Sequence, residues 1–278
     1  LNFNKLKITA SDLNKLKQAT GAGMMDCKKA LEESNGDFEK AVEILRKKGQ
    51  KVAANRADRE SSEGVVLAKV SDDNTYGIIV SLNCETDFVA KNEDYIELAQ
   101  SLADHALNFT DKDSFLNSDF DGMKVSDKLL EQTGVIGEKI EIGSFEYLSS
   151  EFVGSYIHAG NKIASIVGLS QKFDNASEVA KDISMQVAAM NPVALNEDGV
   201  SQDIIEKEIE IAKDQLRQEG KPEEMLDNIA KGKLKKFFKE NTLVNQQFIK
   251  DSKQSISDYL KSQSENAEVT GFSRVGLV

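Results

Sequence analysis

Residues 65–85 read VVLAKVSDDNTYGIIVSLNCE, and this stretch decides the fold class. Val65–Val70 and Tyr76–Glu85 are short apolar runs rich in β-branched residues, which is typical of buried strands. The polar residues Ser71–Thr75 between them include Asp and Asn, which favour turns. The stretch therefore predicts two strands joined by a turn, and we expect a helix to follow from about Glu93 to Leu107.

The same order of elements returns further along the chain. Residues 154–169 read GSYIHAGNKIASIVGL, in which Gly154–Ala159 and Ile163–Leu169 are strand-like. Gly160-Asn161 between them is a tight-turn signal, and a helix is expected over Ala176–Met190. Strand, turn, strand and helix thus occur twice, which predicts an α+β fold with two related core subdomains. Each subdomain is expected to be an antiparallel sheet covered by helices.

Residues 1–56 differ from this core and predict a bundle of three short helices. A capping-box pattern at Thr9–Asp12 begins the first helix. The second is expected between Gly23 and Gly36, and the third between Asp37 and Gly49, because glycine is typical of a helix end. Residues 50–63 are charged and short of large apolar residues, so we expect a linker or a solvated helix there.

After Pro192 the sequence predicts a helical hairpin, formed by Ser201–Gln218 and Pro222–Lys239. Apolar residues lie on two faces of its first helix, and a hairpin can bury only one such face against itself. The second face suggests docking on the body of the protein or on another chain, which leaves a homodimer through the hairpin open. The first face carries Ile205, Ile209, Ala212 and Leu216, and the second carries Ile204 and Ile211.

The chain is therefore expected to divide into four parts. They are a three-helix N-terminal domain with its linker (1–56), a first core subdomain (57–140), a second core subdomain (141–192 and 241–278) and an inserted hairpin (193–240). Ala267–Val278 alternates enough to return as a strand of the second subdomain.

Charge and composition exclude several classes of protein. The formal charge is −12, whereas a nucleic-acid surface needs clustered positive charge, and the dense basic cluster Lys231–Lys239 is flanked by acids. The longest apolar runs are far too short to span a bilayer, and residues 1–13 lack the apolar segment of a signal peptide. Cys27 and Cys84 form no disulfide framework, which suits a reducing compartment. We expect a cytoplasmic protein with no membrane contact and no direct nucleic-acid contact.

The usual signatures of catalysis are missing from the sequence. The only histidines, His105 and His158, belong to no metal-ligand pattern, and neither a phosphate-binding glycine loop nor a GxSxG motif occurs. Cys84 with a distant histidine could act as a thiol nucleophile, but it alternates with the apolar residues of its strand. A buried, inert thiol is therefore favoured, and we expect no enzyme, no cofactor and no metal.

Four residues are candidates for contact with a partner. On a helical wheel Met24 falls with the apolar face of its helix and Met25 falls opposite. Met25 is either a lone exposed methionine, the favoured interpretation, or an adaptable apolar contact for a partner. Extending the strand alternation past Cys84 would point Phe88 into the core. If Asn92 caps a helix, however, the strand breaks before Phe88 and its direction is open. His158 precedes a turn, and from its position a structural histidine is favoured over a contact residue.

Several motifs together resemble bacterial elongation factor Ts, in order and over essentially the whole chain. The motifs are TGAGMMDCKKAL at 20–31, NGDFEKAVEILRKKG at 35–49, TDFVAKN at 86–92, GSYIHAGNKIASIV at 154–167 and NAEVTGF at 266–272. The resemblance implies a ubiquitin-associated-like three-helix domain, a core of two related α+β halves and an inserted helical hairpin.

The resemblance also implies an activity, guanine-nucleotide exchange on elongation factor Tu. Thr86, Asp87, Phe88 and Val89 match the segment that enters the G domain of that GTPase, disturbs its magnesium site and loosens GDP. Lys17, Met24 and Met25 match further contacts with the G domain, and His158 matches a residue that faces the nucleotide-binding region. The alternative from another class is a non-exchange interaction scaffold that uses the ubiquitin-associated-like module.

Overall fold

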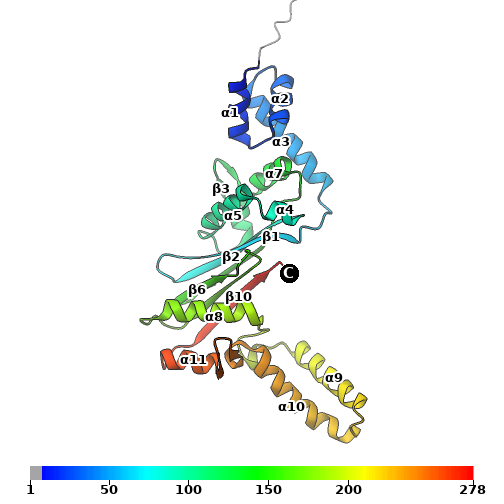
Figure 1. Cartoon of the computed structure of the whole chain (residues 1–278), viewed down its shortest axis with the longest axis vertical. Helices are drawn as coiled ribbons and strands as arrows, with labels where there is room; N and C mark the ends of the chain where they lie inside the picture. The colour runs from blue at the N-terminus through cyan, green and yellow to red at the C-terminus, as the bar shows by residue number, and fades with distance from the viewer. Residues whose placement is uncertain (1–7, 278) are drawn as a thin grey trace, which may run out of the picture. The chain divides into compact units, whose positions relative to one another are not determined.

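The computed structural model describes residues 8–277, which form two compact units (Figure 1). The first unit contains Leu1–Leu67, Val80–Phe145 and Leu277–Val278, and the second contains Ala68–Ile79 and Glu146–Gly276. The chain therefore passes from one unit to the other within the two predicted strands of residues 65–85. The first seven residues of the predicted helical domain, and Val278 of the predicted last strand, lie outside the described residues.

Three helices form the amino-terminal part of the first unit, as predicted. They are α1 (Ala10–Thr20), α2 (Met24–Glu33) and α3 (Phe38–Asn55). The capping box is present, because the Thr9 side chain accepts from the Asp12 N–H while the Asp12 carboxylate accepts from the Thr9 N–H. Asp37 caps α3 by a single bond, in which its carboxylate accepts from the Lys40 N–H at 3.1 Å. The buried side chains of this bundle are Leu16, Ala22, Cys27, Ala30, Leu31 and Ala41.

The prediction that the third helix ends at Gly49 is wrong. Helix α3 continues through Gly49 to Asn55, and α7 (Val125–Ile136) packs along it. Gly49 lies where the two helices cross, because a Cβ atom on Gly134 of α7 would stand only 2.4 Å from the Gly49 Cα. A glycine that reads as a helix end thus serves the close approach of two helices.

The first core subdomain follows the predicted order, with one strand that was not predicted. Strands β1 (Glu63–Val70), β2 (Tyr76–Cys84) and β5 (Glu141–Ser149) make a three-stranded sheet with the order β1-β2-β5. No strand was predicted over β5, because polar residues interrupt its alternation and only Ile142 is buried. The other elements are α4 (Asp87–Ala90), α5 (Glu93–Ala106), α6 (Lys112–Asn117), β3 (Asp119–Phe120) and β4 (Met123–Lys124).

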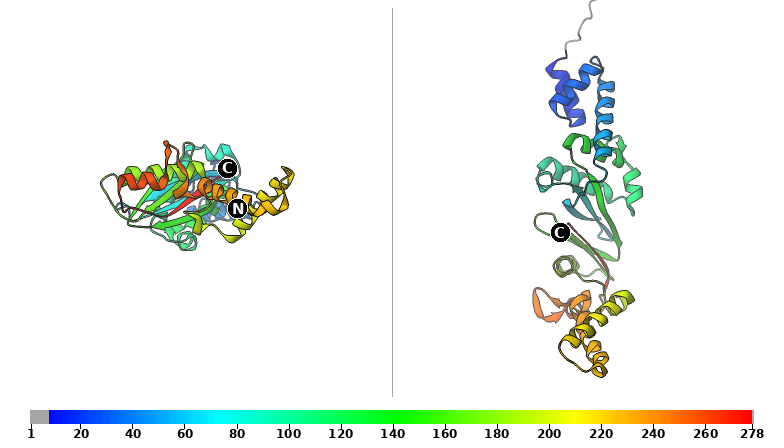
Figure 2. Two further views of the ribbon diagram at one scale, coloured as in Figure 1. Left: turned by 90° about the horizontal axis from the view of Figure 1, so that it is seen from below. Right: turned by 90° about the vertical axis from the view of Figure 1, so that its right-hand side faces the viewer.

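The second sheet lies entirely in the second unit and has the order β10-β7-β6. Strands β6 (Phe152–Ile157) and β10 (Val269–Gly276) both pair antiparallel with β7 (Ile163–Leu169). Helix α8 (Ala176–Met190) crosses one face of this sheet and is seen end-on in the right-hand view of Figure 2. The predicted pair of strands on either side of Gly160-Asn161, the helix that follows them and the returning strand near the end of the chain are therefore confirmed.

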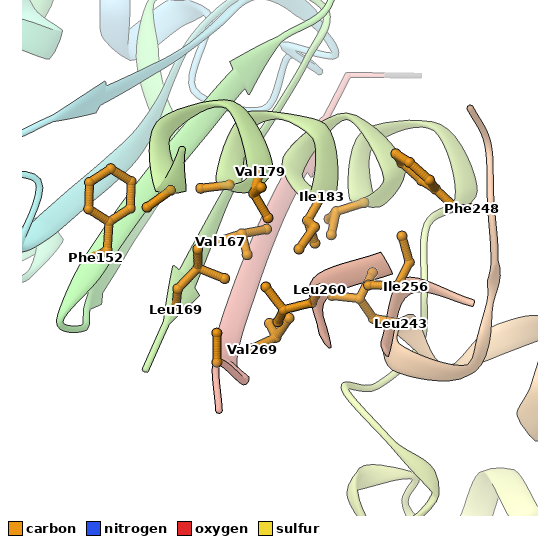
Figure 3. Close-up of a cluster of buried hydrophobic side chains, with 14 residues drawn as sticks. Phe152, Val167, Leu169, Val179, Ile183, Leu243, Phe248, Ile256, Leu260 and Val269 are labelled. Atoms are coloured by element: carbon orange, nitrogen blue, oxygen red, sulfur yellow. The ribbon is translucent and has the colours of Figure 1, made fainter. Parts of the chain in front are cut away.

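A single apolar cluster joins α8, this sheet and the segments that follow the helical hairpin (Figure 3). Those segments are η2 (Leu243–Asn245), β8 (Gln247–Phe248), β9 (Asp251–Ser255) and α11 (Ile256–Gln263). In the close-up Ile183 of α8 lies above Leu260 of α11, and Val167 projects from strand β7 into the same cluster. The labelled members are Phe152, Val167, Leu169, Val179, Ile183, Leu243, Phe248, Ile256, Leu260 and Val269.

The predicted hairpin is formed by α9 (Gln202–Gln218) and α10 (Glu223–Asn241), after a short turn η1 (Glu197–Gly199). Ala212 and Leu216 of the predicted first face are buried, together with Leu226 and Ala230 of α10. Ile211 of the predicted second face is exposed. The dimer through this face stays a prediction. Within residues 8–277 no helix is both long enough and apolar enough to cross a bilayer.

Candidate functional site

The chain turns sharply between β2 and α5, and we call residues 84–92 the Phe88 corner. Strand β2 ends at Cys84, and Thr86 begins the single-turn helix α4 by accepting from the Val89 N–H. Asn92 then caps α5 by accepting from the Asp94 N–H at 2.9 Å. Because two helix starts follow in such short order, the strand alternation ends before Phe88.

Phe88 projects from this corner with 83% of its surface exposed. The direction obtained by extending the strand alternation, into the core, is therefore wrong. Ala90, two residues further along α4, is buried, so the exposed ring and the buried side chain belong to the same helical turn. Large exposed aromatic rings are unusual in a protein surface and mark contact sites.

Two charged residues of the corner, Asp87 and Lys91, are paired with each other. The Asp87 carboxylate accepts from the Lys91 ammonium at 2.6 Å, one helical turn away. This hydrogen bond raises the pKa of Lys91 above its usual value. The pair flanks the Phe88 ring on the surface, so the corner presents an apolar tip beside an ion pair.

Side chains beside the tip are hydrogen-bonded to other parts of the first unit. Glu85 accepts from the Arg56 guanidinium at 2.7 and 2.8 Å and from the Lys139 N–H at 2.7 Å. Burial alone would raise the pKa of Glu85, but these hydrogen bonds outweigh it and lower the pKa below its usual value. The buried Tyr95 hydroxyl donates to the Leu82 carbonyl at 2.7 Å, and burial raises its pKa.

A groove of about 610 Å³ opens beside the ring, and we call it the Phe88 groove. Its apolar walls come from Phe88 and Val89 of α4 and from Val135 and Ile136 of α7. Gly21, in the turn after α1, lines it from the amino-terminal bundle. The remaining lining residues are Thr86, Asn92, Asp94, Tyr95, Gln132 and Glu138.

The sequence predictions did not include the α7 side of this groove. Val135 and Ile136, which line the groove, stand in the last turn of α7. Gly137, which ends α7 in the left-handed region at φ 82°, is the signal that would have found that turn.

The amino-terminal candidates all lie at the surface of the bundle. Met25 is 65% exposed on the first turn of α2, as its position on the helical wheel predicts. Met24 is 43% exposed, although the wheel places it with the buried Cys27. The first turn of α2 extends past the bundle core, which leaves Met24 uncovered. Lys17 is exposed in the last turn of α1.

His158 belongs to the second unit, apart from the other candidates. It follows β6 and is exposed, and its N–H donates to the Ile163 carbonyl at 2.8 Å. The Tyr156 hydroxyl and the His158 Nδ1 are 3.2 Å apart. The tight turn therefore sets the backbone of His158, while its ring stays available to a partner.

Comparisons with known proteins give the family of this chain. A model of the family described as Elongation factor TS matches residues 85–277. The elongation factor Ts of Christiangramia forsetii is 66% identical over 98% of this chain and 99% of its own length. That of Flavobacterium psychrophilum is 63% identical over 97% of this chain and 98% of its own length, and that of Porphyromonas gingivalis is 48% identical over 98% and 99%.

The chain belongs to the elongation factor Ts family. The resemblance of its motifs to that family is confirmed, and so is the α+β fold that the resemblance implied. The family match begins at Glu85, so it contains the whole segment Thr86–Val89 of the corner. The matches to the relatives extend over nearly the whole chain.

Within residues 8–277, no three His, Cys, Asp or Glu side chains are grouped so that they could hold a metal ion. Both cysteines are buried, and the Cys84 thiol donates to the Thr86 carbonyl at 3.2 Å. Cys84 thus supports the backbone of the corner from inside, which is the inert role that the sequence favours.

The two thiols are expected to resist alkylation in the native protein. Cys27 and Cys84 have no exposed surface, and burial also raises the pKa of the Cys27 thiol, which keeps it protonated. Iodoacetamide at neutral pH should therefore modify neither residue until a denaturant is added, as mass spectrometry of the intact protein can show. Rapid modification of Cys84 in the folded protein would favour the thiol-hydrolase alternative instead.

Proposed function

We propose that this chain is a guanine-nucleotide exchange factor for elongation factor Tu. It binds the GDP complex of that GTPase in the cytoplasm and promotes GDP release during translation elongation. The single observation that carries the proposal is the Phe88 ring, displayed with 83% of its surface exposed at a capped corner. The membership of the chain in the elongation factor Ts family supports the same partner.

In this proposal the segment Thr86–Val89 enters the G domain of the GTPase. Phe88 separates two helices of that domain, and the shift disturbs the magnesium site that holds GDP. Exchange then needs no bond chemistry in this chain. A protein that binds the distorted GTPase better than the GDP complex must weaken GDP by the same factor, because the two affinities are thermodynamically linked.

The energy of the ring alone does not account for full exchange activity. A fully buried Phe contributes about 1.5–3 kcal/mol, which shifts an equilibrium by roughly 10- to 200-fold at about 1.4 kcal/mol per decade. A shift of about 10⁴ needs near 5.5 kcal/mol. Further contacts are therefore required, and we assign them to Lys17, Met24 and Met25 of the amino-terminal bundle and to His158 of the second unit.

Release of labelled GDP from purified elongation factor Tu tests the proposal directly. The GTPase is loaded with a fluorescent GDP, an excess of unlabelled GDP is added, and the release rate is followed with and without this chain. We expect strong acceleration at amounts of the chain well below those of the GTPase, because an exchange factor is released and reused. An unchanged rate would favour the scaffold alternative.

Replacing Met25 by aspartate is expected to weaken binding to elongation factor Tu by roughly tenfold or more, because the contact would bury an unpaired carboxylate. The stability of the chain should change by less than about 0.5 kcal/mol, since the side chain is exposed. Titration calorimetry measures the affinity and a thermal melt measures the stability. Met225→Asp on the exposed face of α10 is the matched control and should bind as the unchanged chain does. An unaltered affinity for Met25→Asp would remove the amino-terminal bundle as a contact surface.

A further inference from the structure

The loop after α7 supplies a carboxylate that binds the base of the Phe88 corner. Glu138 accepts three hydrogen bonds from two consecutive residues: the Glu85 N–H at 3.1 Å, the Thr86 N–H at 3.0 Å and the Thr86 hydroxyl at 2.7 Å. Both backbone amides lie between the end of β2 and the start of α4. The left-handed conformation of Gly137, at φ 82°, turns the chain so that Glu138 reaches them.

The Thr86 hydroxyl connects this carboxylate to the helical turn that carries the ring. A hydroxyl has one hydrogen to donate and lone pairs to accept with. Here the hydrogen goes to Glu138, at 2.7 Å, and the oxygen accepts from the Val89 N–H, at 3.5 Å. Glu138 therefore fixes the orientation in which Thr86 can cap α4.

A second set of hydrogen bonds runs in the opposite direction between the same two segments. The Glu85 carboxylate accepts from the Lys139 N–H at 2.7 Å, and Arg56, which follows α3, binds the same carboxylate. Two consecutive residues of the corner are thus bound to two consecutive residues of the α7–β5 loop, side chain to backbone each way. Such reciprocal bonds, made to charged acceptors, hold a segment more firmly than single neutral ones.

We infer that Glu138 is a positioning residue for nucleotide exchange, which holds α4 in the one orientation that presents Phe88 to the partner. The inference rests on the proposed exchange function, and Glu138 acts in it only through Phe88. The Phe88 ring is mostly exposed, so few side chains of its own subunit can hold it in place. Its direction is therefore set by the backbone of α4, whose start is bound by Glu138. A contact residue displaced by about 1 Å can lose up to about 100-fold in rate.

The first test needs no GTPase and measures the corner itself. Hydrogen exchange of the Glu85, Thr86 and Val89 amides is compared between the unchanged chain and Glu138→Ala. For Glu85 and Thr86 we expect exchange at least about tenfold faster in the variant, since their bonds to a charged acceptor are lost. The Val89 amide should also exchange faster, because its acceptor, the Thr86 hydroxyl, loses the partner that orients it. Glu97→Ala, which removes an exposed carboxylate from α5, is the matched control and should change none of the three amides. Unchanged protection in Glu138→Ala would overturn the inference.

The second test is a double-mutant cycle on the release of labelled GDP. Glu138→Ala should lower the maximal release rate by about 10- to 100-fold, while the half-saturating concentration stays the same because the other contacts remain. Glu138→Gln keeps an acceptor oxygen and should recover part of the rate. In a Phe88→Ala background, Glu138→Ala should change the rate by less than about twofold.

The outcomes separate this inference from the proposed function. If the unchanged chain fails to release GDP, the exchange function is wrong, and the amide measurement still decides whether Glu138 holds the corner. If the unchanged chain is active and Glu138→Ala is equally active, the positioning role is wrong. A full additional loss in the Phe88→Ala background would also overturn it, because Glu138 would then act through another contact. Thermal melts of each variant show whether a loss of rate follows from unfolding.

Discussion

Replacing Phe88 by alanine is expected to slow the release of GDP from elongation factor Tu by about 10- to 200-fold relative to the unchanged chain. The estimate corresponds to the transfer energy of one fully buried Phe side chain, about 1.5–3 kcal/mol. The ring is 83% exposed in the free protein, so this energy is gained only in the complex. The measurement is the release rate of fluorescent GDP at a saturating concentration of the chain.

The same substitution should leave the fold intact, and this separates a contact residue from a core residue. Stability should change by less than about 0.5 kcal/mol, as for other surface substitutions. Phe115→Ala is the matched control, because Phe115 of α6 is completely buried in the same unit. That variant should lose about 3–5 kcal/mol of stability. Guanidinium denaturation measures both variants.

Two outcomes would contradict the role given to Phe88. A large loss of stability in Phe88→Ala would mean that the ring packs inside its own subunit. A normal rate of GDP release would mean that the exposed ring is not the group that distorts the GTPase.

Replacing Gly134 by alanine is expected to destabilise the protein by about 1–3 kcal/mol, the usual cost of forcing extra volume into a packed contact. The new Cβ atom would lie 2.4 Å from the Gly49 Cα and 3.2 Å from the Gly49 nitrogen. Both atoms belong to the backbone of α3, so no side chain can move aside. The clash is relieved only if α3 moves away from α7. That movement would also shift the amino-terminal bundle, of which α3 is a part.

Gly232→Ala is the control for this effect and should have the opposite sign. Gly232 lies inside α10, and a Cβ atom there would meet nothing within 4 Å. Alanine in an open helix position is favoured over glycine by about 0.8–1.0 kcal/mol. Denaturant unfolding of the two variants therefore compares the same substitution with and without the helix crossing. A stabilised Gly134→Ala would show that α3 and α7 do not pack this closely.

Local signals in the sequence were sufficient for much of the fold. The caps at Thr9, Asp37 and Asn92 begin the helices where the sequence predicts them, because a cap depends on bonds within a few residues. The turn at Gly160-Asn161 is equally local, and both residues have positive φ. The alternation and apolar character of the long strands predicted β2 and β7 for the same reason.

Other features depend on residues that are distant along the chain. Gly49 reads as a helix end, yet α3 continues because Gly134 of α7 packs against it. Strand β5 has a weak pattern of its own and forms beside β2, where the Ser144 N–H donates to the Ser81 hydroxyl at 2.8 Å. The strand or helix propensity of one segment does not predict a contact that a distant segment provides.

The candidate site divides along the same line. By itself the sequence determined the family, the order of the long helices and of strands β1, β2, β6, β7 and β10, and the break after β2 that frees Phe88 from the strand alternation. Only the tertiary structure decided that the ring points outward, that α7 completes the Phe88 groove, and that Glu138 binds the base of the corner from 52 residues away. The reason is physical: caps and turns are satisfied by neighbouring residues, whereas exposure, grooves and long-range hydrogen bonds exist only once distant segments have packed together.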